Sequence, residues 1–288
     1  MSDSGTEIET GRRFAFGDNW WAFARHVDDA RIGRARESLA AALGSDDLSG
    51  RTFLDVGCGS GLFSLAALRM GARVRSFDFD GTAVAAADGL RRRFAPEAAW
   101  PIEQGSVLDK EFTAGLGRFD VVYAWGVLHH TGALWDALDA TCDLVRPGGL
   151  LYVSVYNDQG RASRLWWRVK RRYNRSGPLT RWTLVLGSAA YLGRRRVLNG
   201  LARRVRRGGR AGGPGARARG MSARHDLVDW VGGFPFEVAT PGEVFSFVRR
   251  RGFELRFLNT CGGGLGCNEY VFERVAAGGT PRDRRLTA

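Results

Sequence analysis

The sequence predicts an α/β fold with a doubly wound, largely parallel sheet, and two patterns carry the prediction. Residues 53–61 (FLDVGCGSG) run from a buried-strand pattern directly into a turn with glycine at every second position. A helical pattern from about Leu62 to Met70 follows, and then a strand pattern from Arg73 that ends on Asp78. A strand, a helix and a second strand in this order form a βαβ unit with parallel strands.

The glycine turn predicts a ligand site. Gly57, Gly59 and Gly61 let the backbone pass close to a ligand because no Cβ stands between them. A dinucleotide fingerprint needs G-x-G-x-x-G, but Leu62 stands where its third glycine belongs, and a phosphate-binding P-loop needs a Gly-Lys-Ser/Thr ending that is missing here. The spacing therefore disfavours both NAD and a nucleoside triphosphate.

Asp78 is a candidate ribose ligand. In nucleoside-binding α/β folds, a carboxylate about 20 residues past the glycine loop accepts hydrogen bonds from ribose hydroxyls, and Asp78 lies at a similar distance past Gly61. The alternative is that Asp78 caps the helix that follows it. The glycine turn upstream favours the cofactor role.

Further motifs make the chain resemble the class I S-adenosylmethionine-dependent methyltransferases. Residues 103–109 (EQGSVLD) resemble that family's adenine-binding loop, 119–130 (FDVVYAWGVLHH) its fourth-strand motif, and 144–149 (LVRPGG) the turn before its fifth strand. With the glycine turn and Asp78 they cover about residues 50–156, in order and at family spacing. The likeness is greatest to the ubiquinone and menaquinone biosynthesis methylases, especially the O-methylating branch.

The resemblance implies a Rossmann-like seven-stranded sheet and S-adenosyl-L-methionine as cofactor. It places the glycines beneath the methionine moiety, Asp55 near its ammonium group and Asp78 on the ribose. Many relatives carry Asp where Ser106 stands, so we do not expect a charged contact with the adenine amino group at this position. The implied cofactor-binding residues are Asp55, Gly57, Cys58, Gly59, Gly61, Asp78, Phe79, Ser106, Val107 and Trp125.

Three histidines are the candidate catalytic residues. Methyl transfer from a sulfonium is an in-line displacement, so the protein must orient two reactants and exclude water. His129 and His130 follow the fourth strand at the edge where open α/β sheets bind ligands, and imidazole titrates near neutrality, which suits a general base. Alternatively, this stretch opens a helix and shapes the pocket while catalysis proceeds by proximity. The resemblance also places His225 in the acceptor pocket, together with Asp226 and Trp230.

Composition narrows the class of protein. The 288 residues suffice for one sizeable core plus an accessory segment, and no apolar run approaches the ~20 residues of a membrane-spanning helix. The polar, acidic start does not resemble a signal peptide, so we expect a cytoplasmic location. The four cysteines have no metal-ligand spacing, so we expect reduced thiols, no metal site, and neither zinc nor a disulfide at Cys261 and Cys267.

The net charge of +13 is concentrated in one segment. Residues 156–224 hold 19 of the 43 basic residues and one acid, Asp158, with tryptophan and tyrosine interleaved. Three interpretations remain open: residues 161–207 adsorb to an anionic membrane and admit a lipophilic substrate, they track a nucleic-acid backbone as in tRNA-modifying methyltransferases, or they form a solvated face of an arginine-preferring chain. The sequence shows no dedicated RNA-binding motif.

These patterns divide the chain into five parts. An N-terminal helical flap (1–48) carries the aromatic run 14–23, in which Trp20 and Trp21 either exclude water from the site or anchor a helix, and a cofactor-binding core (49–156) follows. A basic, helical, Trp-containing insert or lid (157–239) lies between strands 5 and 6. Residues 240–275 supply the last helix, with a capping box at Thr240 and Glu243, and a closing β-hairpin. We expect a disordered tail at 276–288.

The predicted activity is O-methylation of a small phenolic, quinone-like or other lipophilic acceptor by in-line transfer. A first alternative is a tRNA or other nucleic-acid methyltransferase that uses the arginine-rich insert. A second is a cofactor-binding protein without turnover, because fold alone does not settle function. The sequence does not indicate an oligomeric state.

Overall fold

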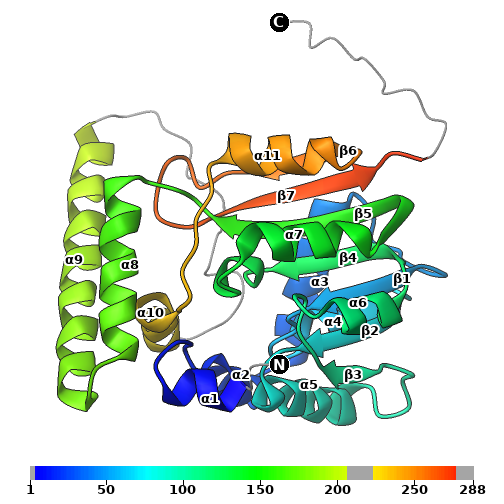
Figure 1. Ribbon diagram of the computed structural model, residues 1–288, viewed down its shortest axis with the longest axis horizontal. Coiled ribbons are helices and arrows are strands. Elements are labelled where there is room, and N and C mark those ends of the chain that lie inside the picture. The colour runs from blue at the N-terminus through cyan, green and yellow to red at the C-terminus, as the bar shows by residue number, and fades with distance from the viewer. Residues whose placement is uncertain (1–3, 206–222, 277–288) are drawn as a thin grey trace, which may run out of the picture.

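The computed structural model describes residues 4–205 and 223–276; for residues 4, 5, 195–205, 223–226 and 229 it describes the backbone alone. In this part of the chain seven strands form one sheet in the order β3-β2-β1-β4-β5-β7-β6 (Figure 1). The strands are β1 (Thr52–Val56), β2 (Arg73–Asp78), β3 (Ile102–Gln104), β4 (Phe119–Trp125), β5 (Val145–Tyr156), β6 (Phe253–Asn259) and β7 (Cys267–Arg274).

The first five strands are parallel, and β7 runs antiparallel between β5 and β6. The chain order reverses between β1 and β4, and open α/β sheets bind ligands beyond the carboxyl ends of the strands at such a point. The predicted seven-stranded α/β fold with an antiparallel closing pair is confirmed.

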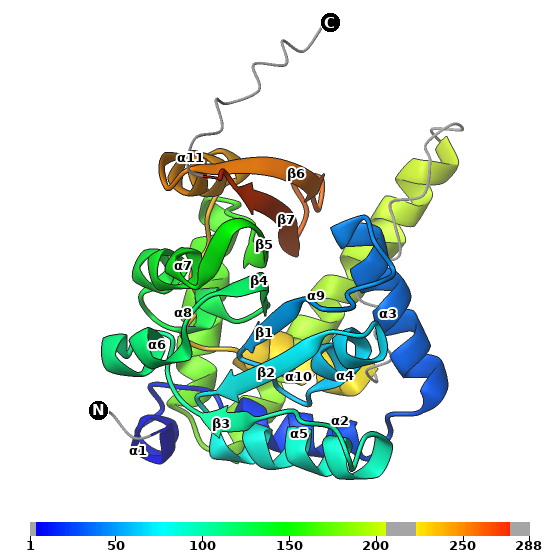
Figure 2. The same cartoon turned by 90° about the vertical axis from the view of Figure 1, so that its right-hand side faces the viewer.

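Helices cover both faces of the sheet (Figure 2). One face buries apolar residues of α6 (Lys110–Leu116), α7 (Leu134–Asp143) and α11 (Pro241–Arg250). The opposite face buries those of α3 (Asp29–Leu43), α4 (Leu62–Arg69) and α5 (Gly81–Phe94). Two hydrophobic layers of this kind fix the strand ends in space, which is what a site at those ends requires.

Local sequence signals begin the core helices where expected. Thr240 and Glu243 form the predicted capping box of α11, with Pro241 in its first turn. Asp80 is the N-cap of α5, where its Oδ1 accepts a hydrogen bond from the Thr82 N–H. Because Asp80 fills this position, the alternative role of Asp78 as the cap is wrong.

The N-terminal segment contributes α1 (Ser4–Glu9), α2 (Phe16–Ala24) and α3. Helix α2 lies against α5 at the bottom of both views, below the carboxyl ends of β1 and β2 (Figures 1 and 2). The helical pattern predicted up to Leu43 is present, and the aromatic run falls on α2 and the loop before it.

The basic insert is helical. It forms α8 (Arg161–Asn174), α9 (Pro178–Val205) and α10 (Ala223–Gly232), and α8 and α9 stand side by side at one end of the sheet with α10 beside them (Figure 1). The face of α8 toward the protein presents Ser163, Trp166, Lys170 and Asn174, a spacing of three and four residues that marks one side of a helix. Residues 206–222 of the predicted insert and nearly all of the predicted tail lie outside the described residues.

Candidate functional site

The glycine turn links the end of β1 to the start of α4. Gly57, Gly59 and Gly61 have φ of 70°, 55° and 77°, a region that favours glycine. The Phe77 carbonyl accepts hydrogen bonds from the N–H groups of Gly57 (2.8 Å) and Cys58 (3.1 Å), which holds the turn against β2. Since α4 begins after Gly61 with no side-chain cap, its positive end faces the turn and favours an anionic ligand group.

Asp78 lies beside this turn with its carboxylate already oriented. Its Oδ2 accepts a hydrogen bond from Gly59 N–H (2.9 Å) and its Oδ1 one from Asp80 N–H (3.0 Å). Each carboxylate oxygen can accept two hydrogen bonds, and each of these two accepts one from the backbone. Asp78 can therefore still accept hydrogen bonds from the two hydroxyls of a ribose. Desolvation raises the pKa of Asp78 to about 6, while the two backbone hydrogen bonds and the charge of Arg13 oppose the rise.

Asp55 braces the turn from within the protein. Its carboxylate is buried and accepts a hydrogen bond from Ser64 Oγ (2.5 Å), and Ser64 is in turn bonded to Ser76 (2.8 Å). Trp100 donates its indole N–H to the same Ser76 (2.8 Å). Burial raises the pKa of Asp55 to about 7. The structure therefore gives this carboxyl a supporting contact between β1 and α4; its predicted contact with the cofactor ammonium stays a prediction.

The predicted adenine side lies at the ends of β2 and β3. Phe79 follows β2, and its ring has the guanidinium of Arg13 above it, 4.6 Å from the ring centroid. Ser106 Oγ accepts a hydrogen bond from Leu108 N–H (3.2 Å) and so shapes the loop after β3. Val107 buries its side chain in the core. Strand pairing thus brings Phe79 and the 106–107 loop to neighbouring strand ends, as expected from the sequence.

The N-terminal flap covers this half of the site. A Cβ on Gly59 would lie 2.8 Å from the ring of Trp20, so the indole packs directly on the glycine turn, whereas Trp21 is largely exposed. The N–H of Gly17, near the start of α2, donates to Asp80 Oδ2 (2.9 Å). One carboxylate therefore accepts hydrogen bonds at the N-terminal ends of both α2 and α5, which docks the flap on the cofactor half.

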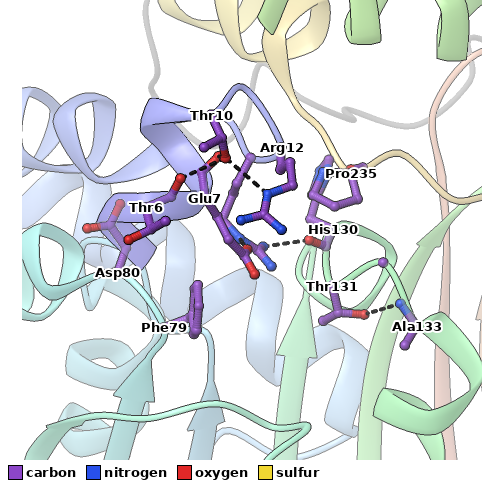
Figure 3. A network of polar contacts seen from close by, with 12 residues as sticks. Thr6, Glu7, Thr10, Arg12, Phe79, Asp80, His130, Thr131, Ala133 and Pro235 are labelled. Atoms are coloured by element: carbon purple, nitrogen blue, oxygen red, sulfur yellow. Dashed lines mark hydrogen bonds and ion pairs between the residues drawn. The ribbon is translucent and has the colours of Figure 1, made fainter. Parts of the chain in front are cut away.

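His129 and His130 lie in a short 3-10 helix, η1 (Leu128–His130), directly after β4, and both are buried. His130 Nδ1 is 2.6 Å from the Pro235 carbonyl oxygen (Figure 3); since a carbonyl only accepts, Nδ1 carries the proton. Burial lowers the pKa of His130 to about 3 and that of His129 well below its usual value. At neutral pH both imidazoles are uncharged and weakly basic, which favours the pocket-shaping alternative over strong general-base catalysis.

An aromatic cluster surrounds these histidines at the end of β5. The ring of Tyr156, the last residue of β5, has its centroid 4.0 Å from that of His129, 5.2 Å from Phe236 and 5.4 Å from Trp230. Lys170 of α8 is fully buried in this cluster, with its ammonium 4.7 Å from the ring centroids of both Trp230 and Phe236. Its Nζ donates to the Trp230 carbonyl, so the lysine also holds the end of α10.

The other predicted site residues lie apart from this cluster or outside the description. Trp125, at the end of β4, donates its indole N–H to Glu269 of β7 (3.2 Å). Cys58 is buried within the turn, and burial together with the charges of Asp78 and Asp55 raises the pKa of its thiol. His225 falls in α10, where its side chain is outside the described residues. Neither Cys261 nor Cys267 forms a disulfide bond within the described residues.

Sequence reasoning missed Arg13, Asp80 and the role of Lys170. Lys170 carries a compositional signal, since it and Lys110 are the only lysines beside 41 arginines. No sequence signal points to Arg13, because its partners Phe79 and His130 lie 66 and 117 positions further along the chain. No group of three or more His, Cys, Asp or Glu side chains suited to a metal ion occurs in the described part of the chain.

The strand order, the glycine turn and the acid at the end of β2 together define the class of S-adenosylmethionine-dependent methyltransferases. A family model described as a methyltransferase domain matches residues 23–183, more than half of the chain, so the protein belongs to that family. The site fits this cofactor, because the turn is a cradle that side chains would fill and Asp78 retains acceptor capacity for a ribose.

Named relatives agree with this assignment. The chain is 34% identical over 115 residues (40% of this chain, 45% of the relative) to a ubiquinone biosynthesis O-methyltransferase of Methylobacterium sp. (strain 4-46). It is 27% identical over 168 residues (54% and 66%) to one of Rhizobium etli (strain CIAT 652). The matches thus span about half to two thirds of these relatives. Magnesium protoporphyrin IX methyltransferase of Synechocystis PCC 6803 shares the fold, with a TM-score of 0.54 at 14% identity over 93% of this chain and 99% of that one.

Proposed function

We propose that this methyltransferase transfers a methyl group to an oxygen of a small phenolic, quinone-like or other lipophilic acceptor. The observation that carries the proposal is the aromatic cluster of Tyr156, Trp230 and Phe236 beside η1, at the carboxyl edge next to the glycine turn. Aromatic walls suit a flat, apolar acceptor, which they contact through ring stacking and apolar burial. The printed names of the relatives support oxygen as the methylated atom.

The residues support a mechanism in which positioning does most of the work. The bound cofactor supplies an electrophilic sulfonium methyl group, and the protein aligns an acceptor oxygen with it and excludes water. Burial lowers the pKa of both histidines, so each imidazole is a weak base. The ammonium of Lys170 within the cluster favours an ionised phenol, since a nearby opposite charge lowers the pKa of an acid.

The test is methyl transfer from radiolabelled S-adenosylmethionine to three acceptors: a catechol with a polyprenyl chain, the same catechol without the chain, and bulk tRNA. We expect turnover on the prenylated catechol, with the label recovered as a methyl ether. Label in tRNA alone would overturn the proposal in favour of the nucleic-acid alternative. Cofactor binding without label in any acceptor would instead support the silent binding protein.

We further propose that the insert holds the enzyme at an anionic membrane surface. On α9, Leu179, Trp182 and Leu186 are 80%, 66% and 49% exposed and share one helix face by their spacing. Exposed arginines lie on α8, which packs against α9, so we expect apolar side chains to enter the interface while cations meet lipid phosphates. In the described residues no helix is long and apolar enough to cross a membrane, so any contact through these helices is peripheral.

Sedimentation with vesicles tests the membrane contact. We expect the protein to pellet with vesicles containing phosphatidylglycerol, and Trp182→Glu to weaken this binding about tenfold or more, since a charge replaces an inserted ring. Leu258→Glu, at an exposed position of β6 outside the insert, is the control and should pellet like the wild type. Equal pelleting of both variants, or no pelleting of the wild type, would contradict the contact.

A further inference from the structure

Arg13 lies in the loop between α1 and α2 and contacts three parts of the molecule that are distant in sequence. Its Nε donates to Glu7 Oε2 of α1 (2.8 Å), and its Nη1 donates to the His130 carbonyl of η1 (2.7 Å). Its guanidinium lies over the ring of Phe79 after β2. Figure 3 shows Glu7, Phe79 and His130 close together, with a dashed line that ends at the carbonyl oxygen of His130.

These contacts distinguish Arg13 from an ordinary surface arginine. The side chain of Arg13 is only 16% exposed and that of Glu7 only 17%, so the ion pair is largely removed from water. A planar guanidinium can donate hydrogen bonds from its edge while its face stacks on an aromatic ring, and that of Arg13 does both. The adjacent Arg12 is exposed, and its side-chain Nε donates to Thr10 of its own loop (3.0 Å).

On the cofactor side, Arg13 acts next to the groups expected to hold the nucleoside. It stacks on Phe79, which the family resemblance implies is a cofactor-binding residue, and its charge favours the ionised form of Asp78. Other flap residues also contact the cofactor half of the site: Trp20 packs on Gly59, and the Gly17 N–H donates a hydrogen bond to Asp80. A cofactor held by Asp78 and Phe79 therefore meets the flap at Arg13.

On the acceptor side, Arg13 acts on the backbone of η1 and its neighbours. Arg13 donates to the carbonyl of His130, and the Nδ1–H of the same histidine donates a hydrogen bond to the Pro235 carbonyl. The next residue, Phe14, donates its N–H to the Phe234 carbonyl (2.9 Å), and a Cβ on Gly232 would lie 2.2 Å from its ring. Two successive flap residues thus bind η1 and the segment 234–236, which carries Phe236 into the aromatic cluster.

We propose that Arg13 is a positioning residue that couples the two halves of the site: it closes the flap on the nucleoside end of the cofactor and, through the His130 carbonyl, sets η1 and residues 234–236 for the acceptor. Cofactor binding then precedes and organises the acceptor side. The assignment of that side rests on the proposed function; the coupling itself does not need it.

The experiment uses S-adenosylhomocysteine as probe and compares Arg13→Ala, Arg13→Lys and the matched control Arg12→Ala. Calorimetry gives the affinity, and hydrogen exchange gives the protection of the amides of His130, Thr131 and Glu237 with and without the probe. These amides donate to carbonyls within η1 or just beside it. Circular dichroism checks that each variant is folded. Arg13→Lys keeps the positive charge but lacks the planar guanidinium, and it replaces Arg13→Ala as the test variant if the latter does not fold.

We expect Arg13→Ala to weaken binding of the probe about tenfold, in line with a lost cation–π contact and charge-assisted hydrogen bonds. It should also abolish the ligand-dependent protection of these amides, with Arg13→Lys intermediate and Arg12→Ala like the wild type. Unchanged affinity with unchanged protection would overturn the proposal, and tighter binding would show that Arg13 competes with the cofactor. Since no acceptor is used, failure of the phenol assay would leave this result intact.

Discussion

The cofactor half of the proposed site, at the ends of β1 and β2, is built mainly from backbone, whereas the proposed acceptor half, at the ends of β4 and β5, is built from side chains of separate segments. The first half uses three glycines at positive φ and backbone N–H groups that orient Asp78. The second uses Tyr156, Lys170 and the 230–236 region, brought together by the insert. A backbone-built site needs a short local sequence, while a side-chain-built site depends on long-range packing.

The largest expected effect is on the cofactor half. Asp78→Ala removes the acceptors for the ribose and the carboxylate that orients Gly59, so we expect affinity for S-adenosylhomocysteine to fall about 100-fold or more while the fold is retained. Calorimetry measures the affinity and circular dichroism the fold. Asp78→Asn keeps the shape and tests the charge alone. Unchanged affinity in the alanine variant would remove the ribose assignment.

Lys170→Met tests whether the acceptor half depends on a side chain. The variant leaves the Trp230 carbonyl without its lysine donor and removes the cation from the aromatic cluster, so we expect the free energy of unfolding to fall by about 2 kcal/mol. Chemical denaturation provides the measurement. Lys110→Met, at an exposed position on α6, is the matched control and should change little. Equal stability of the two variants would show that the buried lysine is dispensable.

Gly59→Ala tests the backbone character of the cofactor half. The added methyl group forces a non-glycine residue to positive φ and meets Trp20, so we expect a loss of about 1–2 kcal/mol in unfolding free energy and weaker cofactor binding. Gly148→Ala has a similar φ of 75° and no atom within 4 Å of its Cβ, so it isolates the backbone cost. If both variants bind the cofactor like the wild type, flap packing on the turn is not required.

The buried carboxyls predict how stability of the cofactor-free protein depends on pH. The pKa values of Asp55 (about 7) and Asp78 (about 6) are raised above those of the unfolded chain, so the native state binds more protons and this contribution to stability falls as pH rises from about 4 to 7. The charges of Arg13 and Asp80 also act on Asp78. Denaturation across this range should show the decline, and Asp55→Asn should flatten its upper part. An identical pH slope in the variant would contradict the burial of a protonated Asp55.

The smallest effect is expected for the histidines. Because both are neutral and weakly basic, His129→Gln and His130→Gln should lower kcat by less than about tenfold, below the 10²–10⁴ typical of a lost general base. In the His130→Gln variant, the side-chain amide can still donate a hydrogen bond toward the Pro235 carbonyl. A loss of 10³-fold in either variant, with a changed pH–rate profile, would restore the general-base hypothesis.

The local features of the fold were predictable from the sequence, because each depends on neighbouring residues. The glycine turn, the strand ending on Asp78, the capping box of α11 and the closing hairpin all follow from residue types within one element and its turn. Their order along the chain then predicts the sheet, since parallel strands with crossover helices allow few topologies. The helical character of the insert also follows from its pattern.

Tertiary structure decided what those elements do. The sequence left open whether Asp78 is a ribose ligand or a helix cap, and only packing shows that Asp80 is the cap and docks two helices while Asp78 faces the turn. The histidine pattern suggested a base, but burial determines the pKa of an imidazole and makes these two weak ones. Arg13 and Lys170 gain their roles from partners distant in the chain. Local sequence determines backbone conformation, whereas the electrostatics and coupling of a site arise from groups that only the folded chain brings together.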